Sequence, residues 1–180
     1  PRSRRAPLHA AAARRDDDAR SDDNDRTVTT PQSRTHTMEV PMIAAALRSR
    51  ILSCQTISSS LALYDAGAGP APAVFTGVPP PEDCPQPLVL ITEEGGRPWG
   101  TRERRGVEAH ALVLLRGDKA RSDKTLGELA ERLWRLLHRA ELTLGGFAEC
   151  GCSAAPPERR SDPHGFPEYR IRVAAFLLET

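Results

Sequence analysis

The sequence predicts an α+β fold, a mainly antiparallel sheet with two helices packed on one face as a two-layer sandwich. Two segments carry apolar residues at helical spacing, and five others have the pattern of strands. Links rich in glycine and proline separate the strand-like segments, which favours hairpin connections. Strands joined by hairpins, with helices packed against one side, are typical of this class.

The first helix is expected to begin near Pro41, because proline is suited to the first helical turn. Its apolar face consists of Ile43, Leu47, Ile51 and Cys54. Residues 66–73 are rich in Gly, Ala and Pro, and this composition predicts a loop. Residues Val74–Thr76 follow as a short strand that Gly77 ends.

Two strands joined by a long exposed hairpin are predicted next. Residues 88–92 form an apolar strand, residues 93–106 are polar and glycine-rich, and residues 107–116 alternate in polarity. Both sides of this last segment become apolar toward its end. The pattern therefore predicts a central strand that is solvated at its start and covered on both faces later.

The second helix carries the strongest helical pattern. Thr125 and Glu128 have the form of a capping box at its start, and Gly145 and Gly146 are expected to end it. Its apolar stripe consists of Leu126, Leu129, Ala130, Leu133, Leu136, Leu137 and Ala140. A strand over 147–155, a proline-rich loop over 156–167 and a final strand over 169–179 complete the predicted order.

The first 37 residues differ in composition from the rest of the chain. They hold eight arginines and six aspartates but only two large apolar residues. Such a segment buries too little surface to offset its ordering entropy, which predicts a disordered charged arm, or an extension upstream of a start at Met38. Residues 38–180 are then expected to form a single domain with 17 basic and 18 acidic residues. This near-neutral balance disfavours duplex binding by the whole domain.

Neither a targeting peptide nor a membrane helix is recognised in the sequence. The acidic residues Asp16, Asp17 and Asp18 follow the first apolar patch too closely for a signal or transit peptide. No run reaches the roughly 18 apolar residues of a membrane helix. We therefore expect a soluble protein made in a cytoplasm.

Catalytic, metal and cofactor sites are not expected. His110, His138 and His164 lack a nucleophile motif such as a nucleophile elbow. Cys150 and Cys152 share one face of a predicted strand and offer two thiolates, to which His164 would add a third ligand. A small metal-dependent enzyme is therefore kept as the least favoured alternative.

The predicted hairpin carries the sharpest surface feature, an arginine group with one tryptophan. The group consists of Arg97, Trp99, Arg102, Arg104 and Arg105. One interpretation is a solvated loop whose tryptophan covers the sheet, and the other is an arm that contacts a neighbouring subunit or lines a channel. Three glutamates nearby temper the charge, which favours subunit contact over nucleic acid. Arg159 and Arg160, in the second proline-rich loop, have the same mixed character.

The order of these segments resembles the tail-terminator, or tail-completion, proteins of long-tailed bacteriophages and prophage-derived particles. The similarity spans residues 38–180, from "MIAAALRSRIL" through "VFTGVPPPEDCPQPLVLITEEGG" and "LGELAERLWRLLHRAEL" to "GFPEYRIRVAAFLLE". Val74, Phe75, Gly77 and Pro79 match the first strand motif of that family, and Tyr169 and Arg170 match the last. The charged arm and the longer Gly, Ala and Pro segment depart from the family pattern.

The resemblance implies a structural virion protein without catalytic activity. Such a protein closes the tail tube as a ring, usually of six subunits, at the head-proximal end of the tail, after assembly in the host bacterial cytoplasm. Its implied partners are further copies of itself, the tail tube protein and the head-tail connector protein, with DNA passing through the lumen without specific binding. A head-tail connector or another minor tail protein is the main alternative.

Overall fold

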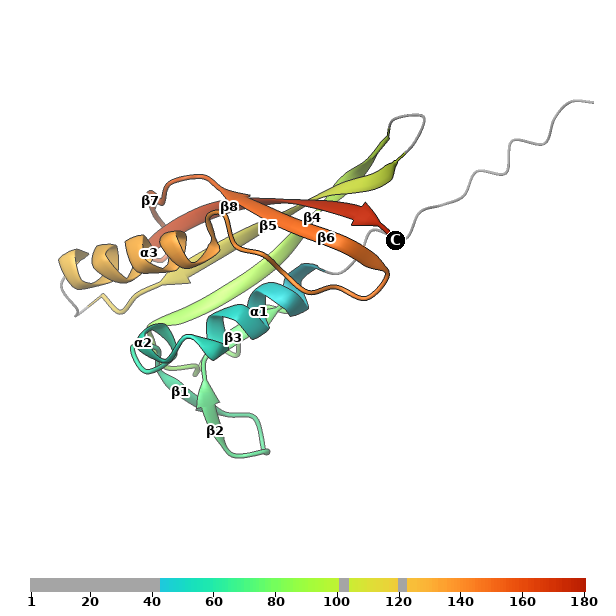
Figure 1. Cartoon of the computed structure of the whole chain (residues 1–180). Coiled ribbons are helices and arrows are strands. Elements are labelled where there is room, and N and C mark those ends of the chain that lie inside the picture. Colours follow the sequence, from blue (N-terminus) through green and yellow to red (C-terminus); the bar gives the residue numbers. More distant parts are fainter. Residues whose placement is uncertain (1–42, 101–103, 120–122) are drawn as a thin grey trace, which may run out of the picture. The chain divides into compact units, whose positions relative to one another are not determined.

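The computed structural model describes residues 43–100, 104–119 and 123–180 (Figure 1). The helices are α1 (Ile43–Ser53), α2 (Gln55–Ser58) and α3 (Asp123–Leu137). The strands are β1 (Leu63–Asp65), β2 (Pro70–Pro72), β3 (Val74–Thr76), β4 (Leu88–Gly100), β5 (Arg105–Arg116), β6 (Phe147–Ala154), β7 (Glu158–Ser161) and β8 (Pro167–Glu179). The predicted arm, residues 1–37, and the predicted helix start at Pro41 lie outside the described residues.

The main sheet confirms the predicted class, because its pairings are antiparallel except one. Its order is β3-β4-β5-β8-β6, and β7 pairs with the opposite end of β8. Only β3 and β4 run parallel. The strand β5 lies between β4 and β8, as its alternation predicted.

Helices α1 and α3 cover the same face of the sheet, also as predicted. Inward residues of adjacent strands, such as Val89, Val113 and Ile171, join one core with Leu47 of α1 and Leu133 of α3. All five side chains are fully buried. Burying a side chain of this size is worth about 1.5 to 3 kcal/mol, so this layer supplies most of the apolar stabilisation.

The predicted loop over 66–73 contains a strand, which corrects the prediction from sequence. Residues Pro70–Pro72 form β2, which pairs antiparallel with β1. Gly67 and Gly69 have positive φ angles of 95° and 101°, and the Asp65 carboxylate accepts hydrogen bonds from both of their amides. These hydrogen bonds hold the turn between the two strands, although the composition of the segment predicts a loop. Prolines are tolerated in β2 because this strand pairs with β1 on one side only.

The second helix has different ends from those predicted. Helix α3 begins at Asp123, so Thr125 is already helical and does not act as the cap residue of a capping box. It ends at Leu137, well before Gly145, and Arg139 takes a left-handed conformation with φ 60°. The Arg139 amide then donates to the Cys152 carbonyl, and the Cys152 amide to the Ala140 carbonyl. The chain leaves the helix because its backbone pairs with the edge of β6.

Two further predictions need correction. The predicted loop over 156–167 contains β7, which pairs with β8 from Glu158 opposite Arg170 to Ser161 opposite Pro167. The expected cover on the second face of β5 is incomplete, because Leu112 and Leu114 stay half-buried while both helices lie on the other face.

A second, smaller cluster holds what we call the β1–β2 lobe, residues 61–72 and 77–87. Ala73, Cys84 and Leu88 are buried together, with Tyr64 and Phe75 packed against them. The two aromatic rings lie 5.7 Å apart. This cluster fixes the lobe to the β3–β4 edge of the sheet, from which it protrudes (Figure 1).

Candidate interaction surface

The predicted hairpin is an extension of the central ladder. Strands β4 and β5 stay paired from Leu88 opposite Arg116 to Gly100 opposite Arg105, with one bulge between Glu93 and Gly95. The end of this ladder projects from the rest of the sheet (Figure 1). Strand β8 pairs with β5 as far as Leu178 opposite Gly106, so Arg97 and Trp99 stand on strands that are paired within the sheet and not in a loop.

Trp99 lies against the backbone of Gly106, its partner across the ladder. A Cβ atom added to Gly106 would come within 2.7 Å of two Trp99 ring atoms and 2.4 Å of the Leu177 carbonyl oxygen. The ring is still 36% exposed. Trp99 therefore covers the sheet on one side and leaves the rest of its surface exposed.

Arg97 is paired within the ladder. Its Nε donates to Glu108 Oε2 at 2.6 Å, while the side chain stays 74% exposed. His110 lies 3.6 Å from the other oxygen of Glu108. Glu93 is one of the three glutamates expected to temper the charge of the arginine group. Its carboxylate instead accepts a hydrogen bond from the Ala44 amide in the first turn of α1.

The remaining residues of the predicted interface lie in two places. Arg104 and Arg105 are exposed at the start of β5, and Arg102 lies outside the described residues. Arg159 and Arg160 are on β7, where they pair with Asp123 at 2.9 Å and with Glu158. Arg105 begins β5, whereas Arg160 lies opposite Glu168 and therefore near Arg116 at the other end of β5, eleven residues or about 36 Å away at strand spacing. The predicted interface residues therefore form two separate groups.

Sequence reasoning missed a buried ionic network beside β7. The Glu168 side chain is 2% exposed and accepts hydrogen bonds from Arg116 Nε at 3.0 Å and from its terminal nitrogen at 2.8 Å. Asp162 lies 3.7 Å from Arg116, and its other oxygen accepts the Phe166 amide. The network ties the segment 162–166 to the end of β5. The pattern gave no signal, because these charges lie in segments that look solvated.

The second face of the sheet carries several partly exposed apolar side chains, which sequence reasoning did not predict. Leu90, Leu112, Leu114 and Leu178 are half-buried, and Phe176 is 46% exposed. The signal was present in β5 and β8, where both sides of the alternation are apolar.

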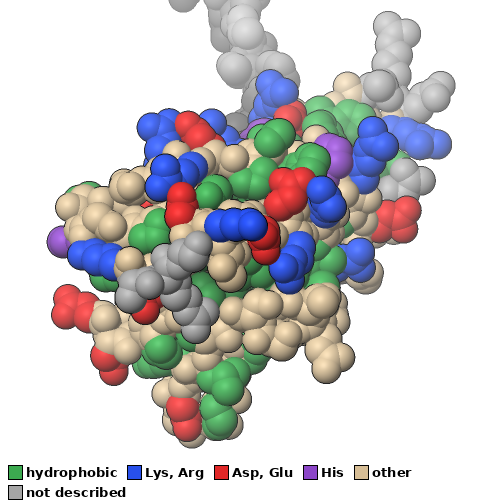
Figure 2. Space-filling view, turned by 90° about the vertical axis from the view of Figure 1, so that its left-hand side faces the viewer, with side chains coloured by type: hydrophobic (Ala, Val, Ile, Leu, Met, Phe, Trp, Pro, Cys, Tyr) green, Lys and Arg blue, Asp and Glu red, His purple; other side chains and the backbone are tan. Residues whose placement is uncertain are grey.

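Figure 2 shows a side of the molecule on which basic and acidic side chains are mixed over its upper part.

The two thiols and the histidine of the metal hypothesis lie apart. Cys150 and Cys152 face the core and are buried. Their mutual hydrogen bond lowers the pKa of the Cys150 thiol and, together with burial, raises the pKa of the Cys152 thiol, which disfavours two thiolates at once. His164 is exposed near Pro167, whereas Cys152 lies opposite Ala175, eight residues or about 26 Å along β8. Among the described residues, no group of three or more His, Cys, Asp and Glu is placed to hold a metal ion.

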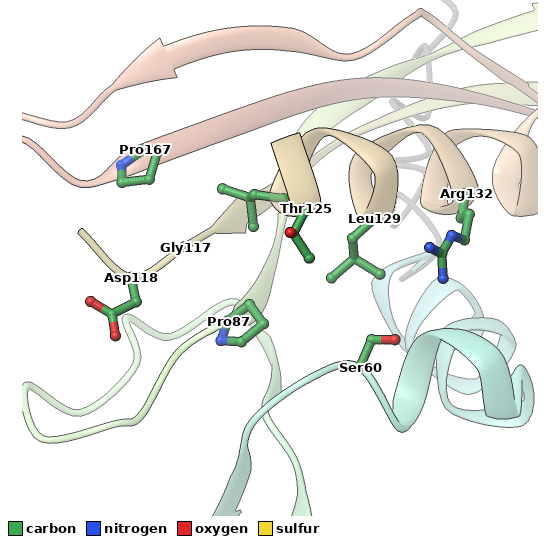
Figure 3. A pocket seen from close by; sticks show the side chains of 9 residues that line it. Ser60, Pro87, Gly117, Asp118, Thr125, Leu129, Arg132 and Pro167 are labelled. Atoms are coloured by element: carbon green, nitrogen blue, oxygen red, sulfur yellow. The ribbon is translucent and has the colours of Figure 1, made fainter. Parts of the chain in front are cut away.

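His138 and a small cavity lie along α3. His138 lies just past α3, where its ring contacts the Ala154 carbonyl at 3.0 Å and stacks on Trp134. A cavity of about 60 Å³ lies beside the N-terminal half of α3, lined by Ser60, Pro87, Thr125 and Leu129 among others (Figure 3). Ligand pockets usually reach several hundred Å³, so this cavity suits no cofactor. In the part of the chain that the structure describes, no helix is long and apolar enough to span a bilayer.

Comparison with known proteins gives a likeness in fold. No protein-family profile matches the sequence, and no curated protein does. A solved structure described as "Virion of native gene transfer agent (GTA) particle" contains a similar chain, with a TM-score of 0.60 and 16% identity. The match covers 79% of this chain and 99% of that chain. At this identity the likeness concerns the fold, and this chain has the fold of a chain found in a virion particle.

Proposed function

We propose that this protein is a structural virion protein of a phage-like particle, and that it closes the tail tube as a ring on the tail side of the head-tail joint. The observation that carries the proposal is the fold shared with nearly the whole length of a chain from a gene transfer agent virion. The order of segments described above, which resembles tail-terminator proteins, supports the same position in the particle.

The surface of the domain is compatible with such a ring. A paired arm that ends in Trp99 and exposed arginines is suited to reach a neighbouring copy, and aromatic and arginine side chains are common anchors of interfaces. The 17 basic and 18 acidic residues after position 37 give the body almost no net charge. A lumen lined by such a surface would let DNA pass without holding it. We propose that the ring has six subunits. Its proposed partners are the tail tube protein and the head-tail connector protein.

Negative-stain electron microscopy of the purified protein over a range of concentrations tests the proposal. We expect uniform rings with an open centre and about sixfold outline, and retention of the tail tube protein in a pull-down. Particles that bind the capsid portal and not the tail tube would favour a connector role instead. Monomers at every concentration, both alone and with tail tubes, would contradict the proposal.

The variant R102S/R104S/R105S tests the role of the arm. We expect it to remain folded and to form rings at least tenfold less readily than the natural sequence. The matched control is R132S/R135S, because both arginines lie on the outer side of α3, in ion pairs with Glu128 and Glu131. Unchanged assembly of the arm variant would remove these arginines from the interface.

A further inference from the structure

Charge is distributed unevenly along the folded chain. Residues 51–92 contain no Lys, Arg or His and three acidic residues, Asp65, Glu82 and Asp83. All three lie in the β1–β2 lobe and are exposed. In Figure 2 the lower part, where this lobe lies, shows acidic and apolar side chains without basic ones on that side. The lobe is therefore an acidic protrusion.

The same lobe presents apolar side chains to solvent. Leu63 is 60% exposed and Val78 is 68% exposed. Leu63 lies on β1, whereas Val78 lies at the β3–β4 edge, where it lines a hollow with Ala45 and Arg48 of α1 and is four residues before Glu82. This combination fits a partner that carries both basic and apolar groups.

The tip of the β4–β5 ladder has the complementary chemistry. Arg97 and Arg105 are exposed there, Arg97 while it pairs with Glu108, and Trp99 keeps a third of its surface exposed. Leu88, at the other end of β4, is packed into the cluster that holds the lobe. Trp99 is eleven residues further along, which is about 36 Å at strand spacing. The tip therefore cannot reach the lobe of its own chain, and only another copy can bring the two together.

We propose that the β4–β5 tip of one copy seats on the β1–β2 lobe of the next copy. This inference rests on the proposed function, because it assumes that the chain assembles with itself. Arg97 and Arg105 face the acids Glu82 and Asp83, and Trp99 packs on Val78. A contact between two different surfaces of the same chain is heterologous, and its repetition closes a ring when the rotation per step allows.

Like charges disfavour the symmetric alternatives. A tip-to-tip contact would oppose basic groups, and a lobe-to-lobe contact would oppose two sets of three acids. Both carry an electrostatic cost that the tip-to-lobe contact avoids. The charge distribution therefore selects head-to-tail contact among the contacts these two surfaces can make.

Mixing two variants tests this arrangement directly. The tip variant is W99A/R105S and the lobe variant is V78S/E82S/D83S, all at exposed positions. Asp65 is kept because its carboxylate holds the β1–β2 turn. Each variant alone should associate at least tenfold more weakly than the natural sequence, as measured by sedimentation velocity and native mass spectrometry. R105S alone is a second tip variant that leaves the Trp99 contact with Gly106 in place.

In the mixture, the lobe variant contributes an intact tip and the tip variant an intact lobe. We expect heterodimers that grow no further, because each heterodimer has one damaged tip and one damaged lobe left. Association of the natural sequence should also weaken as salt is raised. The control R132S/R135S should assemble normally.

Three outcomes would overturn the inference. They are a mixture without heterodimers, normal assembly of either variant alone, and a natural sequence that stays monomeric at every concentration. Rings that form despite both variants would leave the proposed function intact and reject only this contact. A protein that stays monomeric and also fails to bind tail tubes would contradict the proposed function itself.

Discussion

Replacing Glu168 by glutamine should destabilise the domain by about 2 to 3 kcal/mol. The Glu168 side chain is almost fully buried and accepts two hydrogen bonds from the Arg116 guanidinium, at 3.0 and 2.8 Å. Removing one partner of a buried ion pair costs about 3 to 5 kcal/mol. The Arg116 side chain is 29% exposed and regains part of its hydration, so the lower part of this range applies. Glutamine keeps the shape and one acceptor, which lowers the cost further.

Urea unfolding followed by circular dichroism measures this loss. At about 3 °C per kcal/mol for a domain of this size, we also expect Tm to fall by about 6 to 9 °C. The control is Glu158→Gln, because Glu158 pairs with Arg160 at the surface of β7 and both side chains are about half exposed. That change should cost less than about 0.5 kcal/mol. If E168Q and E158Q lose the same small amount, the network is not a source of stability and the reasoning is refuted.

Two further predictions concern a glycine and a tyrosine. Gly106→Ala should destabilise the domain by about 1 to 3 kcal/mol and alter Trp99 fluorescence, because the new Cβ meets the Leu177 carbonyl oxygen at 2.4 Å. Gly151→Ala in the same sheet, where the Cβ meets nothing within 4 Å, should be nearly neutral, and equal losses would contradict this. Burial and the nearby Asp123 carboxylate raise the pKa of Tyr169, so its contribution to stability is present below the unfolded pKa of about 10 and is lost as pH rises through the folded value. Between pH 8 and pH 11 the natural sequence should therefore lose more stability than Tyr169→Phe, and parallel pH profiles from urea unfolding would argue against this.

The elements that sequence reasoning predicted best are those whose own residues carry the full pattern. In β5 the residues Val107, Val113 and Leu115 alternate with less buried ones, and the structure buries that side. The strands β2 and β7 were missed because no local pattern favours them. Each exists because a neighbouring strand offers free backbone groups, β1 for β2 and the start of β8 for β7. Such pairing depends on the tertiary structure, so the local periodicity of the sequence does not predict it.

The ends of α3 show the same limit. The glycines at positions 145 and 146 are ordinary helix-ending signals, and Gly146 does take a positive φ, but in the turn before β6. What ends the helix is the pairing of Arg139 and Ala140 with Cys152. A non-glycine residue accepts the left-handed conformation there because the sheet edge compensates its cost of roughly 1 to 2 kcal/mol.

The interaction surface was predicted in part. The arginines and Trp99 drew attention as a group, since they stand among glycines in a polar segment. The sequence could not tell that Arg97 is paired with Glu108, or that Arg159 and Arg160 lie at the far end of the sheet. Their role in assembly stays a prediction. The acidic lobe was hidden for another reason, because its three acids are spread over nineteen positions, 65 to 83, and come together only through the fold.

A fold shared at 16% identity leaves the contact surfaces free to differ. The buried side chains need only be apolar and of suitable size, so they persist as a pattern, whereas the exposed tips of hairpins carry the charges that select a neighbour. The near-zero net charge of the domain therefore says little about how it assembles. What the proposed contact uses is that Arg97 and Arg105 lie at one end of the β4–β5 ladder, while the three acids of the lobe lie near the other end, about 36 Å away. In the proposed arrangement, such separated charges give the contact between copies a direction, even though the domain as a whole has almost no net charge.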